Sequence, residues 1–302
     1  MAKRFSLEWT AASTDEGKLL REFLKEKEIS RSALTDIKFK GGMITVNGIE
    51  VNVRYQLSSS DNVKVAFPSE EPSAGLRGEP IPLSIMYEDE YILVVNKPPA
   101  MNTIPSREHP YGSLASGLIS YYKEKGIAAT THIVTRLDRD TSGIVLVAKH
   151  SHVHHLFSKQ QREGGIHRTY EALVTGPVGM DEGKIEKPIA RKSDSIIERE
   201  VNPHGQYACT LFHVLNHYDG YTHVKLRLLT GRTHQIRVHM SHIGHPLLGD
   251  SLYGGKKDLI GRQALHCREI EFTHPFLNQV LHFKADIPED IGKLVGKGKP
   301  HE

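Results

Sequence analysis

The chain is poor in cysteine and has no long apolar run. Its 302 residues include two cysteines, Cys209 and Cys267, which excludes a disulfide framework and fits a reducing, cytoplasmic compartment. The longest apolar stretches, such as "GIVLVA", are far too short to span a bilayer, so we expect no membrane segment. The start, "MAKRFSLEWT", has early basic residues but no apolar stretch after them, so we expect no secretory signal.

Net charge and metal-ligand motifs are weak evidence for the function of the chain. Lys and Arg number 39 against 36 Asp and Glu, and a net charge of +3 is weak evidence for a nucleic-acid partner. The 19 histidines cluster in "HSHVHHLF" and "HMSHIGH", but neither HExxH nor a paired CxxC motif occurs. His239, His242 and His245 step by three, so on a helix they spread around the face instead of converging. We therefore expect no metal ion, and a histidine-dependent metallohydrolase is an alternative from another class.

Residues 1–67 predict a small helix and hairpin unit. Apolar spacing predicts a helix within 16–28, and a second helix is expected within 30–42, where two glycines end it. "MITVNGIEV" then predicts a hairpin that turns at Asn47-Gly48, and 61–67 reads as a further strand. The pattern is therefore helix, helix, strand, strand.

Residues 68–80 are rich in Pro, Gly, Ser and Glu and predict a linker, after which 81–302 form a second, larger domain. Expected strands lie near 91–96, 144–148, 168–174, 208–216 and 221–229, and expected helices near 113–124, 151–162 and 234–242. Because strands and helices do not alternate strictly, the pattern favours an α+β fold with a mixed, mainly antiparallel sheet flanked by helices over a doubly wound fold.

The stretch "TRLDRDTSG" (135–143) is a charged segment between two apolar ones. By its local chemistry it is a solvated turn, since turns commonly contain Asp, Ser and Gly. Its place between two expected strands also puts Asp138 at a rim, where loops on a rigid scaffold often hold reactive groups. The stretch alone leaves both interpretations open.

Two later stretches add to this one. "HRTYEALVTG" (167–176) and "LLTGRTHQIRVHMSHIGHPLLGDSLYG" (228–254) follow in order, and "YEDEYILVVNKPP" precedes them. Together the four resemble the RluA-type pseudouridine synthases over about residues 81–290. The resemblance implies isomerisation of uridine to pseudouridine in RNA. No redox change occurs and no group is added, so no cofactor is expected.

The resemblance also implies roles for single residues. Asp138 matches the catalytic aspartate, Tyr170 the ring that stacks on the target uracil, and Arg232 the basic residue that pairs with the aspartate. Arg136 resembles the arginine that fills the space left by the extruded base, while His234 and Arg237 are expected as supporting residues near the RNA backbone. A nearby arginine would keep a partly buried aspartate ionised.

The N-terminal unit resembles the S4 RNA-binding module over roughly residues 14–67. If so, RNA phosphates would be met by Arg31, Ser32, Lys38 and Lys40, although charges on a helix face are usually only solvated. Ribosomal RNA is the expected partner, with transfer RNA as the alternative. No required protein partner is evident.

Two positions depart from the family pattern. The family usually has His before Arg-Leu-Asp, where this chain has Thr135, and a glycine after "KPx", where this chain has Ala100. Both bear on how RNA fits more than on the proposed catalytic group. A non-catalytic RNA-binding factor that kept the fold is the second alternative, but such a protein would not need Asp138, Tyr170 and Arg232 together.

Overall fold

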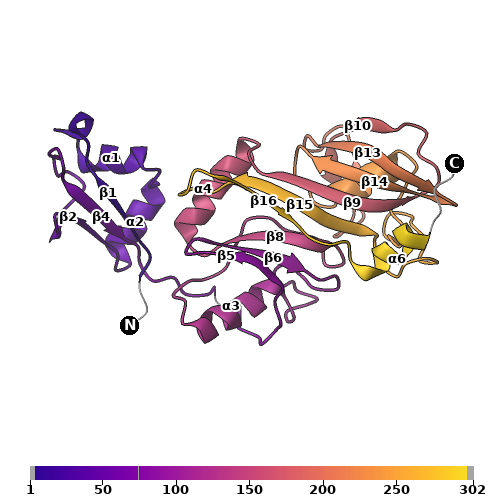
Figure 1. The fold of residues 1–302 in the computed structure, drawn as a ribbon, viewed down its shortest axis with the longest axis horizontal. Helices are drawn as coiled ribbons and strands as arrows, with labels where there is room; N and C mark the ends of the chain where they lie inside the picture. Colours follow the sequence, from indigo (N-terminus) through magenta and orange to yellow (C-terminus); the bar gives the residue numbers. More distant parts are fainter. Residues whose placement is uncertain (1–3, 74, 298–302) are drawn as a thin grey trace.

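The computed structural model describes residues 4–73 and 75–297 and consists of two sheet-based units. Figure 1 shows the small N-terminal unit beside one end of the larger unit, with the N-terminus on the small unit and the C-terminus at the far end of the large one. Within the described residues, no helix is both long enough and apolar enough to cross a membrane.

The small unit is a four-stranded sheet with two helices. Its strands lie in the order β1 (Ser6–Thr10), β4 (Asn62–Ala66), β2 (Met43–Val46) and β3 (Ile49–Glu50), accompanied by the short 3-10 helix η1 (Ser13–Asp15) and by α1 (Leu20–Glu26) and α2 (Arg31–Phe39). Positive φ angles of 52° at Asn47 and 80° at Gly48 confirm the predicted hairpin turn. Strand β1 was not predicted, because five residues carry too little periodicity to separate a strand from a loop.

The large unit has one ten-stranded sheet, which confirms the α+β prediction. Its main path runs β10 (Glu182–Glu186), β13 (Cys209–Tyr218), β14 (Tyr221–Leu228), β9 (His167–Thr175), β15 (Leu265–Thr273), β8 (Ser142–Ala148), β6 (Ile92–Lys97) and β5 (Ile85–Glu88), while β16 (Val280–Lys284) pairs with β15 and β7 (His132–Ile133) with β8. Within the described chain, every neighbouring pair in this sheet is antiparallel except β15 with β8.

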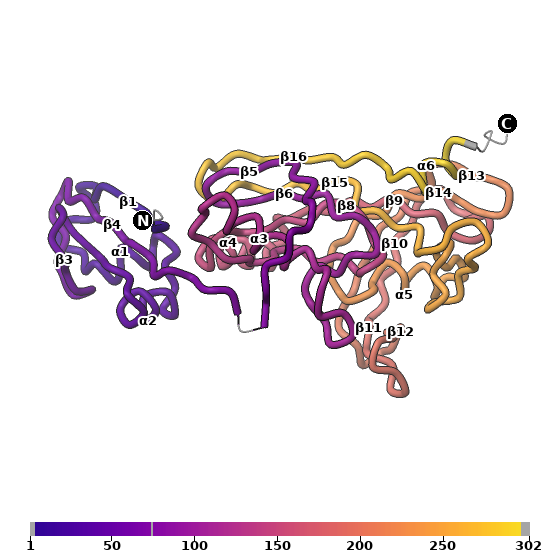
Figure 2. The backbone as a smooth tube through the Cα atoms, turned by 90° about the horizontal axis from the view of Figure 1, so that it is seen from below, coloured from indigo at the N-terminus to yellow at the C-terminus, as the bar shows by residue number. Residues whose placement is uncertain are grey.

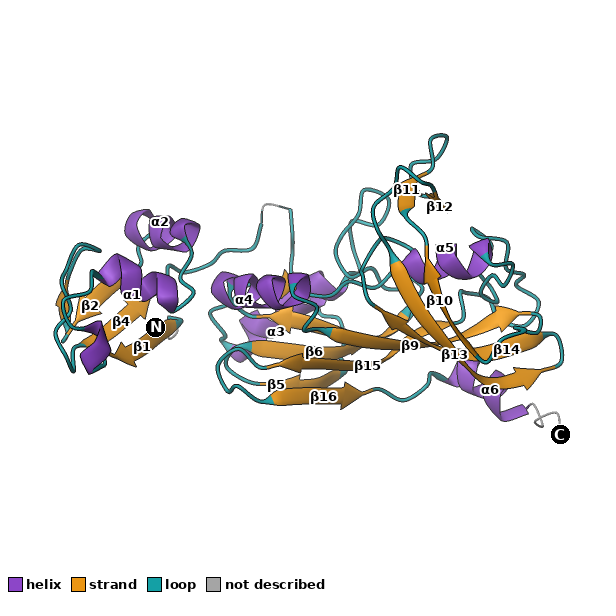
Figure 3. Cartoon of the chain, turned by 90° about the horizontal axis from the view of Figure 1, so that it is seen from above, coloured by secondary structure: helices purple, strands orange, loops and turns teal. Residues whose placement is uncertain are grey.

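Helices flank this sheet and one hairpin leaves it. The helices are α3 (Leu114–Lys125), α4 (Ser151–Arg162), α5 (Gln235–His242) and α6 (Glu289–Lys297), close to the predicted ranges where one was predicted. Ser113 caps α3 by accepting the Ser116 N–H at 3.1 Å. A separate hairpin, β11 (Ile189–Arg191) with β12 (Arg199–Val201), projects on the side where α5 lies, and α2 of the small unit faces that side too (Figures 2 and 3).

Aromatic stacking holds the small unit against the start of α4. The Phe5 ring stacks on His150 with centroids 4.0 Å apart, and Phe67 stacks on His152 at 5.2 Å. In the predicted linker, Glu70 accepts the Ser151 N–H at 2.9 Å. These contacts fix the placement of the small unit.

Candidate active site

The Arg-Leu-Asp turn lies between β7 and β8 at the edge of a cavity of about 980 Å³. Strand β8 follows the turn directly and is buried along its whole length, so it fixes the C-terminal end of the turn. Gly143 has a φ of +113°, and a Cβ there would lie 2.2 Å from the Cys267 carbonyl oxygen. The "TSG" end of the motif thus needs glycine so that β8 can approach β15 closely.

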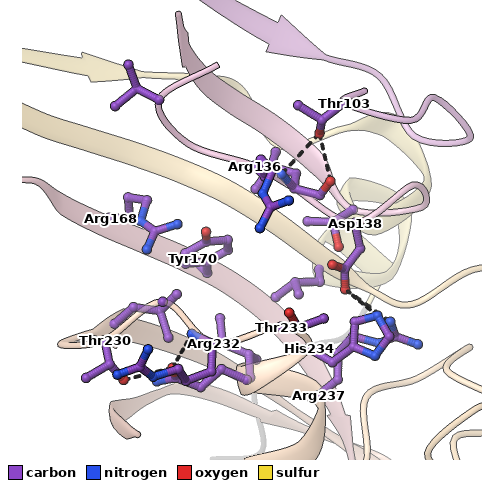
Figure 4. A pocket seen from close by; sticks show the side chains of 18 of the residues that line it. Thr103, Arg136, Asp138, Arg168, Tyr170, Thr230, Arg232, Thr233, His234 and Arg237 are labelled. Atoms are coloured by element: carbon purple, nitrogen blue, oxygen red, sulfur yellow. Dashed lines mark hydrogen bonds and ion pairs between the residues drawn. The ribbon is translucent and has the colours of Figure 1, made fainter. Parts of the chain in front are cut away.

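Two side chains, one from the end of β6 and one from the loop that follows it, hold the turn on either side of Asp138. The Thr103 hydroxyl donates to the Leu137 carbonyl at 2.7 Å and accepts the Leu137 N–H at 3.2 Å (Figure 4). The buried ammonium of Lys97 donates to the Arg139 carbonyl at 3.1 Å. Burial lowers the pKa of Lys97 to about 7, although the nearby charge of Asp138 opposes that shift. No motif in the sequence pointed to Thr103.

Arg237 is the cation that pairs with Asp138. Its Nη1 donates to Asp138 Oδ2 at 3.0 Å, while its Nε and Nη2 donate to the two oxygens of Asp250 at 2.7 and 2.8 Å. Burial opposes the charge on Arg237, but the two carboxylates raise its pKa. The Asp138 side chain keeps 28% of its surface exposed, so this carboxylate is both charge-paired and open to the cavity.

The expected pairing of Arg232 with Asp138 is wrong. Arg232 lines the same cavity, but its Nε donates to the Tyr207 carbonyl at 2.9 Å and its Nη1 to Gln206 at 3.0 Å. The reason is local: α5 begins at Gln235, so Arg232 belongs to the preceding loop, whereas Arg237 projects from the first turn of the helix. Arg237 is also misplaced in the prediction, because it is buried between carboxylates and does not face outward to an RNA backbone.

His234 lies beside the carboxylate. Its Nε2 is 3.8 Å from Asp138 Oδ2, and only 12% of its side chain is exposed. Its backbone is left-handed, with a φ of 56°, which is uncommon outside glycine and costs about 1–3 kcal/mol. This turn directs the ring toward Asp138, whereas the prediction placed His234 as a supporting residue near the RNA backbone.

Tyr170 and Arg136 contribute the walls of the cavity. Tyr170 comes from β9 and is 4% exposed, and burial raises the pKa of its hydroxyl well above the usual range, so it stays protonated. Arg136 is exposed and points into the same space as Tyr170 and Arg168 (Figure 4). Arg168, two residues before Tyr170, lines the cavity as well and had not been predicted.

The predicted RNA contacts of the small unit lie on α2 and at its C-cap. Arg31, Ser32 and Lys38 of the helix and the C-cap residue Lys40 are all exposed. Ser30 caps the helix by accepting the Ala33 N–H at 3.1 Å. Ser32 therefore lies in the first turn of the helix. Lys40 pairs with Asp36 at 2.9 Å on the surface.

The histidine clusters have separate partners. His239 contacts the Thr210 hydroxyl and the Lys187 carbonyl, each at 2.9 Å, while His245 contacts the Thr175 carbonyl at 3.0 Å. Across the part of the chain that the structure describes, no group of three or more His, Cys, Asp or Glu side chains is placed to hold a metal ion.

Comparisons with known proteins show the family of the chain. A model of the RNA pseudouridylate synthase family matches residues 91–242. The RNA pseudouridine synthase YjbO of Bacillus subtilis (strain 168) is 52% identical over 93% of this chain and 99% of its own. Ribosomal large subunit pseudouridine synthase D of Yersinia pestis is 35% identical over 98% of this chain and 95% of its own.

A solved structure, that of Human RNA Pseudouridylate Synthase Domain Containing 1, has a TM-score of 0.60 and 26% identity, covering 77% of this chain and 92% of that one. The chain therefore belongs to the RNA pseudouridylate synthase family and is an RNA pseudouridine synthase, an isomerase. This sets aside the metallohydrolase and the non-catalytic binding factor as alternatives.

Proposed function

We propose that this enzyme isomerises specific uridines of ribosomal RNA to pseudouridine, with Asp138 as the reactive carboxylate and with no cofactor. The observation that carries the proposal is the pairing of Asp138 with Arg237 at 3.0 Å, at the edge of a cavity that Tyr170 also lines. The name of the similar Yersinia pestis protein, a ribosomal large subunit pseudouridine synthase, supports the choice of RNA. This substrate also fits the cytoplasmic location expected from the sequence.

The chemistry explains the residue types. The N1–C1′ bond of uridine breaks, the base turns, a C5–C1′ bond forms, the C5 proton leaves and N1 gains a proton. Electrons and atoms balance within one nucleotide, so the reaction needs no oxidant and no group donor. An ionised carboxylate is suited to act on the ribose or on the base, and the guanidinium of Arg237 stabilises its charge.

The target base must leave the RNA stack to reach Asp138, which costs a few kcal/mol. Stacking on an aromatic ring recovers roughly 1–3 kcal/mol per base, and Tyr170 is the ring in the cavity suited to this. Arg136, exposed at the same cavity, would fill the gap in the RNA or bind a phosphate. Asp138, Tyr170 and Arg136 thus each have a role toward an extruded base in the cavity.

Residues 1–67 would serve as an S4-like RNA-binding domain. Support comes from the exposed basic side chains of α2, a helix that faces the same side as the projecting hairpin. Replacing Lys38 and Lys40 with Gln should weaken RNA binding and make its salt dependence shallower, by about 0.7–0.9 in log–log slope per lost phosphate contact. The matched control replaces Lys225 and Lys284 with Gln. These two lysines are also exposed, but they lie on β14 and β16 of the large unit. Equal slopes for both pairs would contradict this role.

The proposed function is tested by mapping pseudouridine in total RNA from cells with the gene, without it, and with Asp138→Asn in its place. We expect one or a few ribosomal RNA sites to lose the modification in both altered strains. A loss confined to transfer RNA would overturn the ribosomal assignment. Complete modification with Asp138→Asn would overturn the role of the carboxylate.

A further inference from the structure

The "GDSLYG" turn (249–254) packs against α5 and brings two of its side chains to the site. Gly249 has a φ of +75°, and a Cβ there would lie 1.9 Å from the Arg262 carbonyl oxygen, so the turn needs glycine at this point. Asp250 holds Arg237. Tyr253 lies below the same guanidinium, whose Cζ is 4.9 Å from the ring centroid. The ion pair with Arg237 explains why Asp250 stands at this site. The contact of Tyr253 with the same guanidinium does not by itself explain why a tyrosine hydroxyl is there.

The Tyr253 hydroxyl has two hydrogen-bond partners. The backbone N–H of Arg199 donates to the Tyr253 oxygen at 2.9 Å, and the same oxygen lies 2.8 Å from Nδ1 of His234. A backbone N–H only donates, so the hydroxyl accepts there and its own proton is available for His234. A ring that accepts at Nδ1 carries its proton on Nε2 when it is neutral.

The surroundings of His234 favour its neutral form, in which the choice of tautomer matters. Burial lowers the pKa of His234, and the charges facing the ring are those of Asp138, Arg237, Asp250 and Arg199. The protonated Nε2 would then point to Asp138 Oδ2, 3.8 Å away. Arg237 donates to this same oxygen at 3.0 Å, so within the described structure both cationic or N–H partners lie on the Oδ2 side, and Oδ1 is left for the substrate.

We propose that Tyr253 is a positioning residue of the isomerisation, whose hydroxyl fixes His234 as the Nε2–H tautomer and so directs an N–H at Asp138. Under this assignment the Nε2–H of His234 faces the carboxylate as an electrostatic partner at 3.8 Å, and the ring does not take up a proton at Nε2. The same hydroxyl ties β12, in the hairpin beside the cavity, to His234. The catalytic part of this inference rests on the proposed function, whereas the tautomer is a property of the protein alone.

Long-range proton–nitrogen NMR correlations of the 15N-labelled full chain, without RNA, report the tautomer directly. The His234 signals are assigned by their loss in His234→Asn. We expect a neutral Nε2–H pattern at pH 7.5 in the wild type and a mixture of tautomers in Tyr253→Phe. Tyr221→Phe is the matched control, because it likewise removes a hydrogen-bonded tyrosine hydroxyl, here one that donates to the Leu294 carbonyl at 3.0 Å, and it should leave the pattern unchanged. A wild-type Nδ1–H pattern, or no change in Tyr253→Phe, overturns the proposal.

Kinetics test whether the tautomer matters. Tyr253→Phe should lower kcat by about tenfold, the effect of one lost hydrogen bond, and leave KM for RNA nearly unchanged. An unchanged kcat despite a changed tautomer would overturn the positioning role. If the wild type makes no pseudouridine but shows the expected tautomers, the proposed function fails and, with it, the catalytic role of Tyr253, while the hydrogen-bond assignment holds. Should Tyr253→Phe fail to fold, the wild-type spectrum still decides the tautomer.

Discussion

The Nη1 atom of Arg237 donates to Oδ2 of Asp138 at 3.0 Å, and the remaining donors of the same guanidinium are held by Asp250. Only 7% of the Arg237 side chain and 1% of the Asp250 side chain are exposed. One arginine therefore sets the orientation of the proposed reactive carboxylate and neutralises a second, buried one.

Removing Arg237 should destabilise the fold as well as the site. In Arg237→Met two carboxylates lose their cation, and breaking a buried ion pair from one side typically costs 3–5 kcal/mol. Arg232→Met, which alters an exposed side chain of the same cavity, should stay within about 1 kcal/mol of the wild type. Urea unfolding of both variants measures the difference, and equal losses would contradict the assignment of Arg237 as the buried partner.

The docking contact of the small unit should weaken in mild acid. Burial lowers the pKa of His150 and of His152 to about 4, whereas an unfolded histidine titrates near 6.5. Between these values the unfolded chain binds more protons, so this stability is complete above pH 6.5 and is lost as the pH falls toward 4. Between pH 7 and pH 5, each histidine should lower the free energy of unfolding by about 2 kcal/mol.

His150→Phe keeps a ring against Phe5 and removes one titrating group, so its stability should fall less on acidification. Denaturant unfolding at pH 7 and pH 5 gives the comparison. Glu70 also faces His150. Burial opposes the charge of the Glu70 carboxyl, but the hydrogen bond with His132 keeps its pKa low, and Glu70 is present in both proteins. An identical pH dependence in the variant would show that His150 does not carry the effect.

The protein should be less stable with alanine at position 100 than with glycine there. Its φ of 60° lies in the left-handed region, which costs an L-residue with a Cβ roughly 1–2 kcal/mol. Ala100→Gly should therefore raise stability by about 0.5–1 kcal/mol, after the entropy cost of glycine. Gly126→Ala, at a φ of 65° after α3, should act in the opposite direction. A lower Tm for Ala100→Gly would contradict the backbone strain assigned to Ala100.

The sequence predicted the parts of this molecule that have local causes. The Asn47-Gly48 turn follows from the need for positive φ, and the buried β8 and the α4 helix follow from runs of suitable length and period. Asp138 and Tyr170 were singled out by their motifs, and the structure brings both to one cavity, although Asp138 lies in the turn before β8 and Tyr170 lies within β9.

The errors concern side-chain direction. Arg232 and Arg237 are chemically alike and five residues apart, and only the start of α5 at Gln235 decides which one reaches Asp138. Thr103 could not be predicted, because its partner Leu137 is 34 positions away along the chain. Tyr253 stood in a recognised motif, but its role depends on Arg199 and His234, which only the folded chain brings together.

The central claim is that Asp138 is the reactive carboxylate and that the neighbouring Asp140 is structural. Asp140 pairs at the surface with Arg139 at 3.1 Å, and its backbone carbonyl accepts from Arg262 at 2.9 Å. Asparagine at position 138 keeps the size and hydrogen bonding of the side chain but is a far weaker nucleophile and cannot serve as a base. Asparagine at position 140 preserves the turn, because its side chain is also suited to turns.

The most direct measurement is tritium release from RNA containing uridine labelled at C5, with RNA binding and thermal melting of both variants as controls. Asp138→Asn should fold, bind RNA with near-normal affinity and release no detectable tritium, while Asp140→Asn should retain much of the activity. Normal turnover by Asp138→Asn, with a folded but inactive Asp140→Asn, would mean that the other aspartate is the catalytic one. Full activity in both variants would mean that "TRLDRDTSG" is only a solvated turn.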